Sequence, residues 1–192
     1  MRINRKASSL LCGVSALVLA WDGSERDPIA PRNVASTVTA LTSMGASGAG
    51  ATGYAEIHGT TVQGIKDEIF SFTALSTGSA FAAMGQVAVH FLTFTNSEVT
   101  VHAEVTCLSV VDNQAWVGSR ITRFARDGEA VPARVGLPMV FTVMDVGEDE
   151  GATDLASLVF FGSSDDLEFC NTRPAIPVLR LSTNGGIQVR SE

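Results

Sequence analysis

One run of strictly alternating apolar and polar residues, residues 99–108 (VTVHAEVTCL), constrains the fold of this 192-residue chain more than any other feature. Successive side chains of a β-strand point to opposite faces, so an alternation of period two predicts a strand with one buried and one exposed face. Residues 85–94 (GQVAVHFLTF) follow the same pattern. The short polar segment Thr95-Asn96-Ser97 between the two runs predicts an antiparallel hairpin with a three-residue loop.

The hairpin has one register that places apolar residues opposite each other. It pairs Phe91 with Val101 and Val89 with Ala103, because cross-strand apolar pairs stabilise a sheet. A shift by one residue would bury His102 and expose the valines, so the pattern disfavours that shift.

The rest of the chain after residue 53 consists of further strand patterns separated by turn signals. The intervals are too short for crossover helices, and no window shows sustained helical periodicity. We therefore expect an all-β fold, an antiparallel meander that closes as an up-and-down β-barrel. A two-layer β-sandwich is the alternative.

The N-terminus has the form of a secretory signal peptide. Arg2, Arg5 and Lys6 precede the apolar run of residues 10–20, and Ala20 provides the small side chain that signal peptidase requires. The run is shorter than the roughly 20 apolar residues that a membrane span needs. We expect cleavage after Ala20, and hence a secreted or periplasmic protein.

Composition divides the mature chain into three parts. Residues 21–52 predict a flexible N-terminal arm that ends in a linker rich in Gly, Ala and Ser, residues 53–172 form the β-domain, and residues 173–192 form a tail that adds an edge strand or stays loose. A GxGxxG pattern at positions 48, 50 and 53 leads into a strand pattern instead of a helix, which argues against a dinucleotide site.

The charge of the mature chain narrows the range of partners. The signal peptide holds three of the thirteen basic residues and none of the twenty acidic ones, which leaves a formal charge of −10. Nucleic acids and anionic membrane surfaces are therefore not expected partners. No later segment is long and apolar enough for a membrane span.

Two cysteines remain after cleavage, because Cys12 lies in the signal peptide. An even pair in an exported protein predicts one disulfide, between Cys107 and Cys170, closing a loop of roughly 60 residues. Cys107 occupies an apolar position in the alternation of its strand. Two buried free thiols or a metal-binding pair are the alternatives.

Three segments follow one another in a fixed order: Val105-Thr106-Cys107-Leu108, then Asn113-Gln114-Ala115-Trp116-Val117-Gly118, then Val143-Met144-Asp145-Val146-Gly147-Glu148 with Asp154 downstream. This order resembles that of small secreted bacterial β-rich proteins of unknown function, over roughly residues 53–170. The resemblance implies export, a β-fold and a bond between the two cysteines, and it implies no activity. In the proteins that it resembles, the third segment more often reads D-N-G-E-G, and Val146 and Asp149 depart from that reading.

The acidic loop of residues 145–154 is the first candidate site. Carboxylates between flexible glycines are ligands that calcium prefers, and the candidate ligands are Asp145, Glu148, Asp149 and Asp154. Gly147 stands where an EF-hand needs an acidic residue or Asn, so the loop is no EF-hand. A solvated turn that keeps a sheet edge soluble is the interpretation we favour.

The predicted hairpin register supplies a second candidate. It sets His90 opposite His102 on the polar face, with Glu104 two residues further along. Two imidazoles and one carboxylate form a set that suits zinc or nickel. Cross-strand polar pairs also occur for structural reasons alone.

Motifs for catalysis are absent: the sequence contains no GxSxG, HExxH or P-loop pattern. We expect a non-enzymatic exported β-domain with a structural or binding role, no cofactor other than calcium, and a protein or small apolar ligand as partner. The alternatives are a small barrel that binds an apolar ligand, and a metal-dependent enzyme or calcium-binding module. An interior filled by Phe70, Phe72, Phe91 and Trp116 would argue against the apolar ligand.

Overall fold

A computed structural model of the chain describes residues 48–58, 64–78, 81–147, 153–162, 165–180 and 186–191. All of them belong to the second of the two units into which the chain divides, Asn33–Glu192. The predicted signal peptide of residues 1–20, with Cys12, lies outside the described residues.

The described residues form one antiparallel sheet with two short helices. The strands are β1 (Gly50–His58), β2 (Ile65–Ser76), β3 (Ala83–Thr93), β4 (Glu98–Val111), β5 (Gln114–Arg126), β6 (Glu129–Ala130), β7 (Pro138–Met144), β8 (Leu155–Ala156), β9 (Phe160–Phe161), β10 (Leu179–Arg180) and β11 (Gly186–Arg190). The helices are the 3-10 helix η1 (Pro132–Arg134) and α2 (Asp166–Thr172). The prediction of an all-β antiparallel fold with barrel-like character is confirmed.

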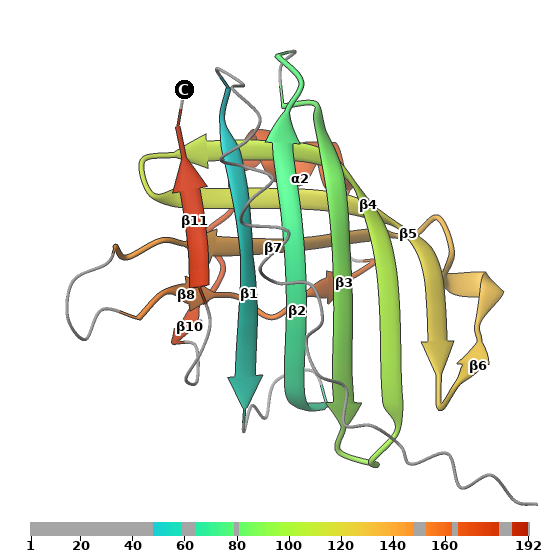
Figure 1. Ribbon diagram of the computed structural model, residues 1–192. Coiled ribbons are helices and arrows are strands. Elements are labelled where there is room, and N and C mark those ends of the chain that lie inside the picture. The colour runs from blue at the N-terminus through green and yellow to red at the C-terminus, as the bar shows by residue number, and fades with distance from the viewer. Residues whose placement is uncertain are drawn as a thin grey trace, which may run out of the picture. The chain divides into compact units, whose positions relative to one another are not determined.

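The sheet is strongly curled and forms a half-barrel. Its strand order is β10-β8-β7-β5-β4-β3-β2-β1-β11, with β6 paired to β5 and β9 to β7. Strand β7 crosses β1, β2 and β3, and the long strands β4 and β5 bend from one direction into the other (Figure 1). Their ladder shifts register between His102 and Ala103 and again between Val105 and Cys107. Such bulges let a strand bend sharply, so β4 and β5 contribute to both layers of the half-barrel, the one that contains β1, β2 and β3 and the one that contains β7.

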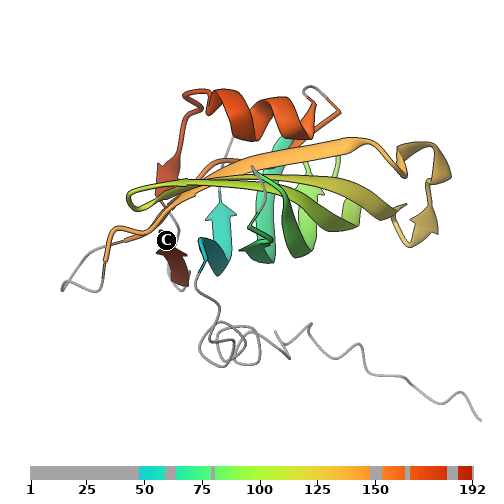
Figure 2. The ribbon, with the colours of Figure 1, turned by 90° about the horizontal axis from the view of Figure 1, so that it is seen from above.

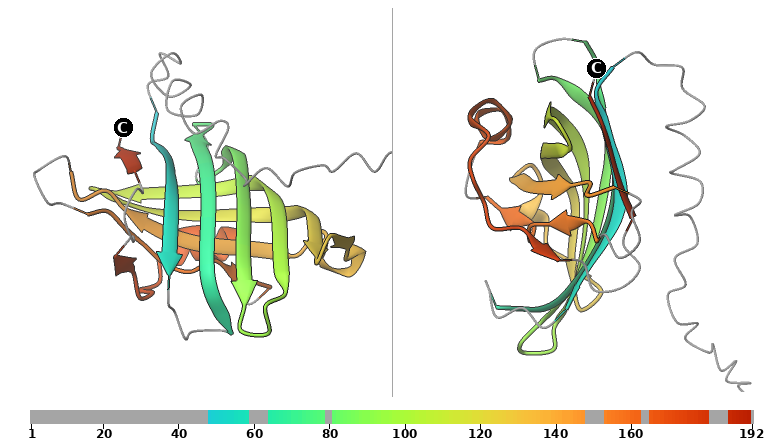
Figure 3. Two further views of the ribbon diagram at one scale, coloured as in Figure 1. Left: turned by 60° about the horizontal axis from the view of Figure 1, so that its bottom comes forward. Right: turned by 90° about the vertical axis from the view of Figure 1, so that its left-hand side faces the viewer.

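The apolar interior lies between the two layers, on the concave side of the curled sheet (Figure 3). Phe70, Phe72 and Phe141 are at most 2% exposed. The Phe141 ring meets Phe70 and Phe72 edge-on, with centroids 5.1 and 5.2 Å apart. Phe91 is also buried here. Trp116 is buried in a separate cluster, which is described below.

The register of the central hairpin differs from the predicted one by two residues. Val89 lies opposite Val101 and not opposite Ala103. The turn begins one residue earlier than predicted, because the Thr93 N–H donates to the Ser97 carbonyl over 3.0 Å and the Thr93 hydroxyl accepts from the Ser97 N–H, also over 3.0 Å, which leaves residues 94–96 as the loop. A shift of two residues keeps every side chain on its predicted face.

Strand β1 begins at Gly50, so the predicted linker to residue 52 extends too far. Strand β1 pairs with β2 on one side and with β11 from the C-terminal tail on the other. A Cβ atom on Gly53 would lie 2.6 Å from the carbonyl oxygen of Gly186. The glycine that resembled linker composition is a close-packing position.

Helix α2 was not predicted from the sequence. It covers the outer face of the layer formed by β4, β5 and β7 (Figure 2). Phe169 of α2 packs there with Trp116 and Val140 in a second apolar cluster. The Trp116 indole N–H donates to the Pro174 carbonyl over 3.0 Å. The sheet therefore buries side chains on both faces in this layer.

Candidate functional site

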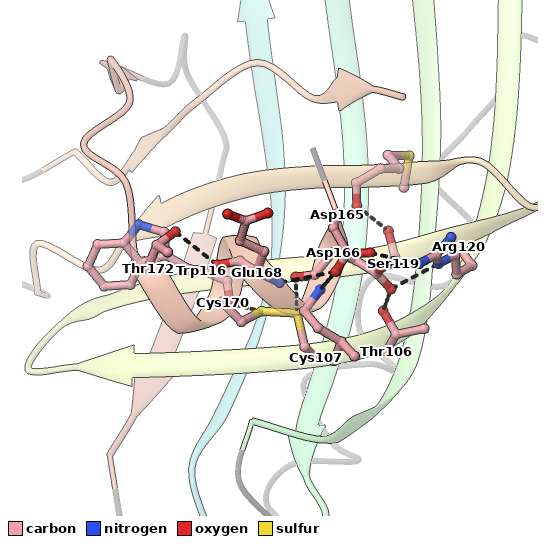
Figure 4. Close-up of a disulfide and its surroundings, with 12 residues drawn as sticks. Thr106, Cys107, Trp116, Ser119, Arg120, Asp165, Asp166, Glu168, Cys170 and Thr172 are labelled. Atoms are coloured by element: carbon pink, nitrogen blue, oxygen red, sulfur yellow. Dashed lines mark hydrogen bonds and ion pairs between the residues drawn. A yellow bond between two sulfur atoms is a disulfide. The ribbon is translucent and has the colours of Figure 1, made fainter. Parts of the chain in front are cut away.

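Cys107 of β4 and Cys170 of α2 form the predicted disulfide (Figure 4). Their Cα atoms are 6.2 Å apart, and both residues are fully buried. Cys107 faces α2 and not the interior, which corrects the side expected from the alternation. The register shift at Thr106 reverses the faces for the rest of β4. The disulfide fastens the helix to the sheet.

A charged cluster holds the other end of α2. The Arg120 guanidinium binds both carboxylate oxygens of Asp166, one over 3.0 Å, and the Thr106 hydroxyl donates to the same carboxylate (Figure 4). Burial raises the pKa of Asp166, but the hydrogen bonds from Arg120 and Thr106 outweigh it and hold the pKa below its ordinary value. Asp165 caps the helix by accepting from the Leu167 and Glu168 N–H groups. The polar groups of this cluster therefore find their hydrogen-bond partners in one another and in the first turn of α2.

The acidic loop joins β7 to the C-terminal strand. Asp145 accepts from the Gly147 N–H over 2.9 Å and from the Val189 N–H over 3.1 Å. Asp154 accepts from the Val146 N–H over 3.0 Å and from the Ile187 N–H over 2.7 Å. All four oxygens thus bind backbone amides.

Two of the predicted calcium ligands, Glu148 and Asp149, lie outside the described residues, so the calcium site stays a prediction. In the part of the chain that the structure describes, no group of three or more His, Cys, Asp or Glu residues is placed to hold a metal ion.

A third polar cluster lies at the end of β1 and was not predicted. The His58 ring nitrogens contact Glu56 over 2.7 Å and Asp67 over 3.1 Å. Burial lowers the pKa of His58, but the hydrogen bonds to Asp67 and Glu56 raise it more, so the net shift is upward. The carboxylates therefore favour the imidazolium, and this cluster too is internally paired.

A hollow of about 300 Å³ lies on the outer, polar face of the sheet over β2, β3, β4 and β5. Its floor is low because Ser71 and Ala88 are small and lie side by side in the ladder, with His102 next to Ala88. Gln86 and Glu104 lie opposite each other in the β3–β4 ladder, two residues from Ala88 and His102. The remaining lining is Phe72, Thr73, Val87, Ala103 and Thr122.

Thr122 reaches the hollow because it is the extra residue of the β4–β5 bulge, between the partners of His102 and Ala103. Its hydroxyl donates to the His102 carbonyl over 3.2 Å. Bulges redirect side chains in this way and are frequent beside binding sites.

The hydroxyls of Thr122 and Thr73 have partners, in the His102 carbonyl and the Thr52 hydroxyl, but other polar groups of the hollow do not, unlike those of the three clusters above. Among the described residues, the side chains of Ser71, Gln86, His102 and Glu104 make no hydrogen bond or ion pair. Together they offer an amide, a hydroxyl, an imidazole and a carboxylate to a ligand. We therefore take the hollow as the candidate site.

The predicted zinc or nickel set is arranged differently from the prediction, and the set stays a prediction. His102 and Glu104 lie two residues apart on β4 and both line the hollow. His90 lies opposite Thr100 and not opposite His102, because the hairpin register is shifted by two residues. Ser71, Gln86 and Thr122 were missed by the sequence analysis. The residues that make Ser71 part of a hollow are 17 and 31 positions away in the chain, at Ala88 and His102, and only the ladder brings them together.

Comparison with protein-family models, with curated proteins and with solved structures finds no match to this chain. The resemblance to secreted bacterial β-rich proteins accordingly stays a prediction. Among the described residues, no helix is long and apolar enough to cross a membrane.

Proposed function

We propose that the chain is an exported binding domain that holds a small polar solute in the hollow on its outer face and catalyses no reaction. The observation that carries the proposal is the group of four unpaired polar side chains, Ser71, Gln86, His102 and Glu104, around a floor of small residues. Elsewhere in the described part of the chain, the clusters around Asp166, His58 and Asp154 are occupied by their own partners.

The lining indicates the kind of solute. A volume of about 300 Å³ is at the lower end of the range of ligand-site volumes, and suits a small molecule with at most a few rings. The Phe72 ring is not offered for stacking, because it is buried in the interior cluster, and the one ring in the lining is the His102 imidazole. Glu104 lies in the lining and the whole chain has a formal charge of −7, so a neutral or cationic solute with hydroxyl or amide groups is favoured over an anion.

Export is supported by the disulfide and by the form of the first twenty residues. Disulfides persist in oxidising compartments and are rare in the reducing cytosol. The bond between Cys107 and Cys170 joins elements that are 63 residues apart in the sequence, as expected of a structural bridge.

The alternative of an apolar ligand in the barrel interior receives less support. Phe70, Phe72 and Phe141 are buried and in ring contact where such a ligand would lie. An interior that is already filled by packed aromatic side chains leaves a ligand little room.

The proposal can be tested with the mature chain, residues 21–192, and a panel of sugars, polyols, amino acids, amides and amines. Amide chemical shifts are recorded with each solute at about 10 mM, where a site with a Kd of about 1 mM is mostly filled. We expect at least one solute to shift the amides of Ala88 and Ala103.

Two matched variants assign the binding to the hollow. Ala88→Leu places a larger side chain on its floor and should abolish the shifts. Thr100→Leu adds a similar apolar surface to the same face of the sheet, on β4 and outside the hollow. This variant should bind the solute as the unmodified protein does. Shifts that survive Ala88→Leu, or a panel in which no solute acts, would contradict the proposal.

A further inference from the structure

A glutamate lies inside the apolar interior of the half-barrel. Glu68 of β2 is 0% exposed, with Ile57 of β1 on one side of it in the ladder and Phe91 of β3 on the other. Its Oε1 accepts a hydrogen bond from the Val159 N–H over 2.9 Å. Its Oε2 is buried without a partner. A buried carboxyl group with an unsatisfied oxygen is costly, and sequences seldom keep one at no benefit.

Within the described part of the chain, no opposite charge compensates Glu68. The interior-facing residues of β1, β3 and the segment between β8 and β9 in the described chain are apolar, including Ile57, Phe91 and Leu158. The charged neighbours in β2 are Lys66, which is exposed, and Asp67, which binds His58. Burial raises the pKa of Glu68 to about 8, and the Val159 hydrogen bond lowers it only in part. Glu68 is therefore uncharged in the folded protein at neutral pH.

Val159 belongs to a connection that has few other restraints toward β2. It lies between β8 and β9, and each of these pairs with β7 over only two residues. The Ser157 N–H and hydroxyl hold the start of the connection to Thr142 and to the Leu158 carbonyl. The bond from Val159 to Glu68 ties this connection to β2, across the interior.

We infer that Glu68 and Val159 form a pH-sensitive clasp. Uncharged Glu68 accepts the Val159 N–H and keeps the β8–β9 connection closed over the interior. When Glu68 loses its proton to water, the carboxylate leaves the apolar interior for solvent, the hydrogen bond breaks, and the connection opens beside β2. Opening at this place is less costly than unfolding the long ladders of β2, β3 and β4, because the two-residue strands β8 and β9 contribute few hydrogen bonds.

Hydrogen exchange of single amides, followed by NMR at pH 6 and pH 9.5 and corrected for intrinsic rates, tests the clasp. We expect the protection of the Val159 amide to fall about tenfold or more at the higher pH, while Val101 and Val117 in the central ladders keep theirs. Glu68→Gln has nearly the same shape and cannot ionise, so it should abolish the fall. Glu129→Gln removes an exposed carboxylate outside the hollow instead and should leave the fall unchanged.

A second measurement needs no variant. The carboxyl carbon of Glu68, followed by NMR, should titrate with the same midpoint as the loss of protection at Val159. An equal loss of protection at all three amides would indicate global unfolding and overturn the inference. A Val159 amide that keeps its protection at pH 9.5, or that loses it in Glu68→Gln as well, would overturn it too.

Discussion

The carboxylate of Asp154 accepts a hydrogen bond from the backbone N–H of Ile187 over 2.7 Å, and so links the end of the acidic loop to the last strand. Asp145 does the same for Val189. Strands β10 and β11 stand at the two ends of the strand order, so the edge of β11 that faces away from β1 has no partner strand in the described residues. Side chains of the loop satisfy its amides where a closed barrel would use a neighbouring strand.

Asp154→Asn should destabilise the protein by about 1–3 kcal/mol, because one of two carboxylate acceptors for backbone amides becomes an amide donor. Urea unfolding measures the change, and hydrogen exchange at Ile187 locates it. Asp112→Asn is the control: Asp112 sits in a turn with φ 53°, a conformation that Asn tolerates well, and its side chain makes no hydrogen bond within the part of the chain that the structure describes. Equal stabilities of the two variants would argue against the linking role of Asp154.

Replacement of both Cys107 and Cys170 by Ala should lower the free energy of unfolding by about 2–5 kcal/mol, because the unfolded chain regains the freedom of a long loop. Differential scanning calorimetry measures the loss. Reduction of the unmodified protein should reproduce it. Detection of two free thiols in the unfolded, unreduced protein would contradict the bond on which this prediction rests.

Asp166→Asn should destabilise the protein by about 1–3 kcal/mol at neutral pH, because Arg120 and Thr106 lose a charged acceptor. The pKa of Asp166 is lowered in the folded state, so its contribution is present above the ordinary carboxyl pKa of 3.8 and is lost as the pH falls through the lower folded-state value. Urea unfolding at several pH values should therefore show the difference between the two proteins shrinking in acid. A difference that does not change with pH would show that the lost interaction is not ionic.

Glu68→Gln should stabilise the protein at alkaline pH. The pKa of Glu68 is raised from 4.5 to about 8, so its favourable contribution is complete below 4.5 and is lost as the pH rises through 8. The unmodified protein should lose on the order of 5 kcal/mol over that range, and the variant should not. Unfolding midpoints in urea at pH 5, 7 and 9 measure both slopes. Parallel slopes would mean that Glu68 ionises in the folded state at an ordinary pH.

The alternation of apolar and polar residues was sufficient to predict the strands of the central hairpin and the faces they bury. It did not determine the register, because the bonds between Thr93 and Ser97 place the three-residue turn one position earlier, and this shifts the register by two without changing which face is apolar. The inward side of Cys107 was wrongly predicted for a similar reason, since a bulge at Thr106 leaves no mark in a pattern of period two.

Helix α2 is too short for periodicity to reveal it, with seven residues. The one available signal was its N-cap, Asp165 followed three residues later by Glu168, and that pair alone is common in loops. The hollow could not be predicted at all. Ser71 and Ala88 are unremarkable residues of polar strand faces, and only their adjacency in the ladder makes a depression.

The pairing of β1 with β11 also has a consequence for folding during synthesis. Gly50 lies opposite Arg190, so the first and last strands of the domain depend on each other. Contacts between such distant parts of a chain form late in folding. The half-barrel cannot be completed until the residues of β11 have left the ribosome. Until then the free edge of β1 is open to other chains, and a chain cut short before β11 would keep that edge exposed permanently.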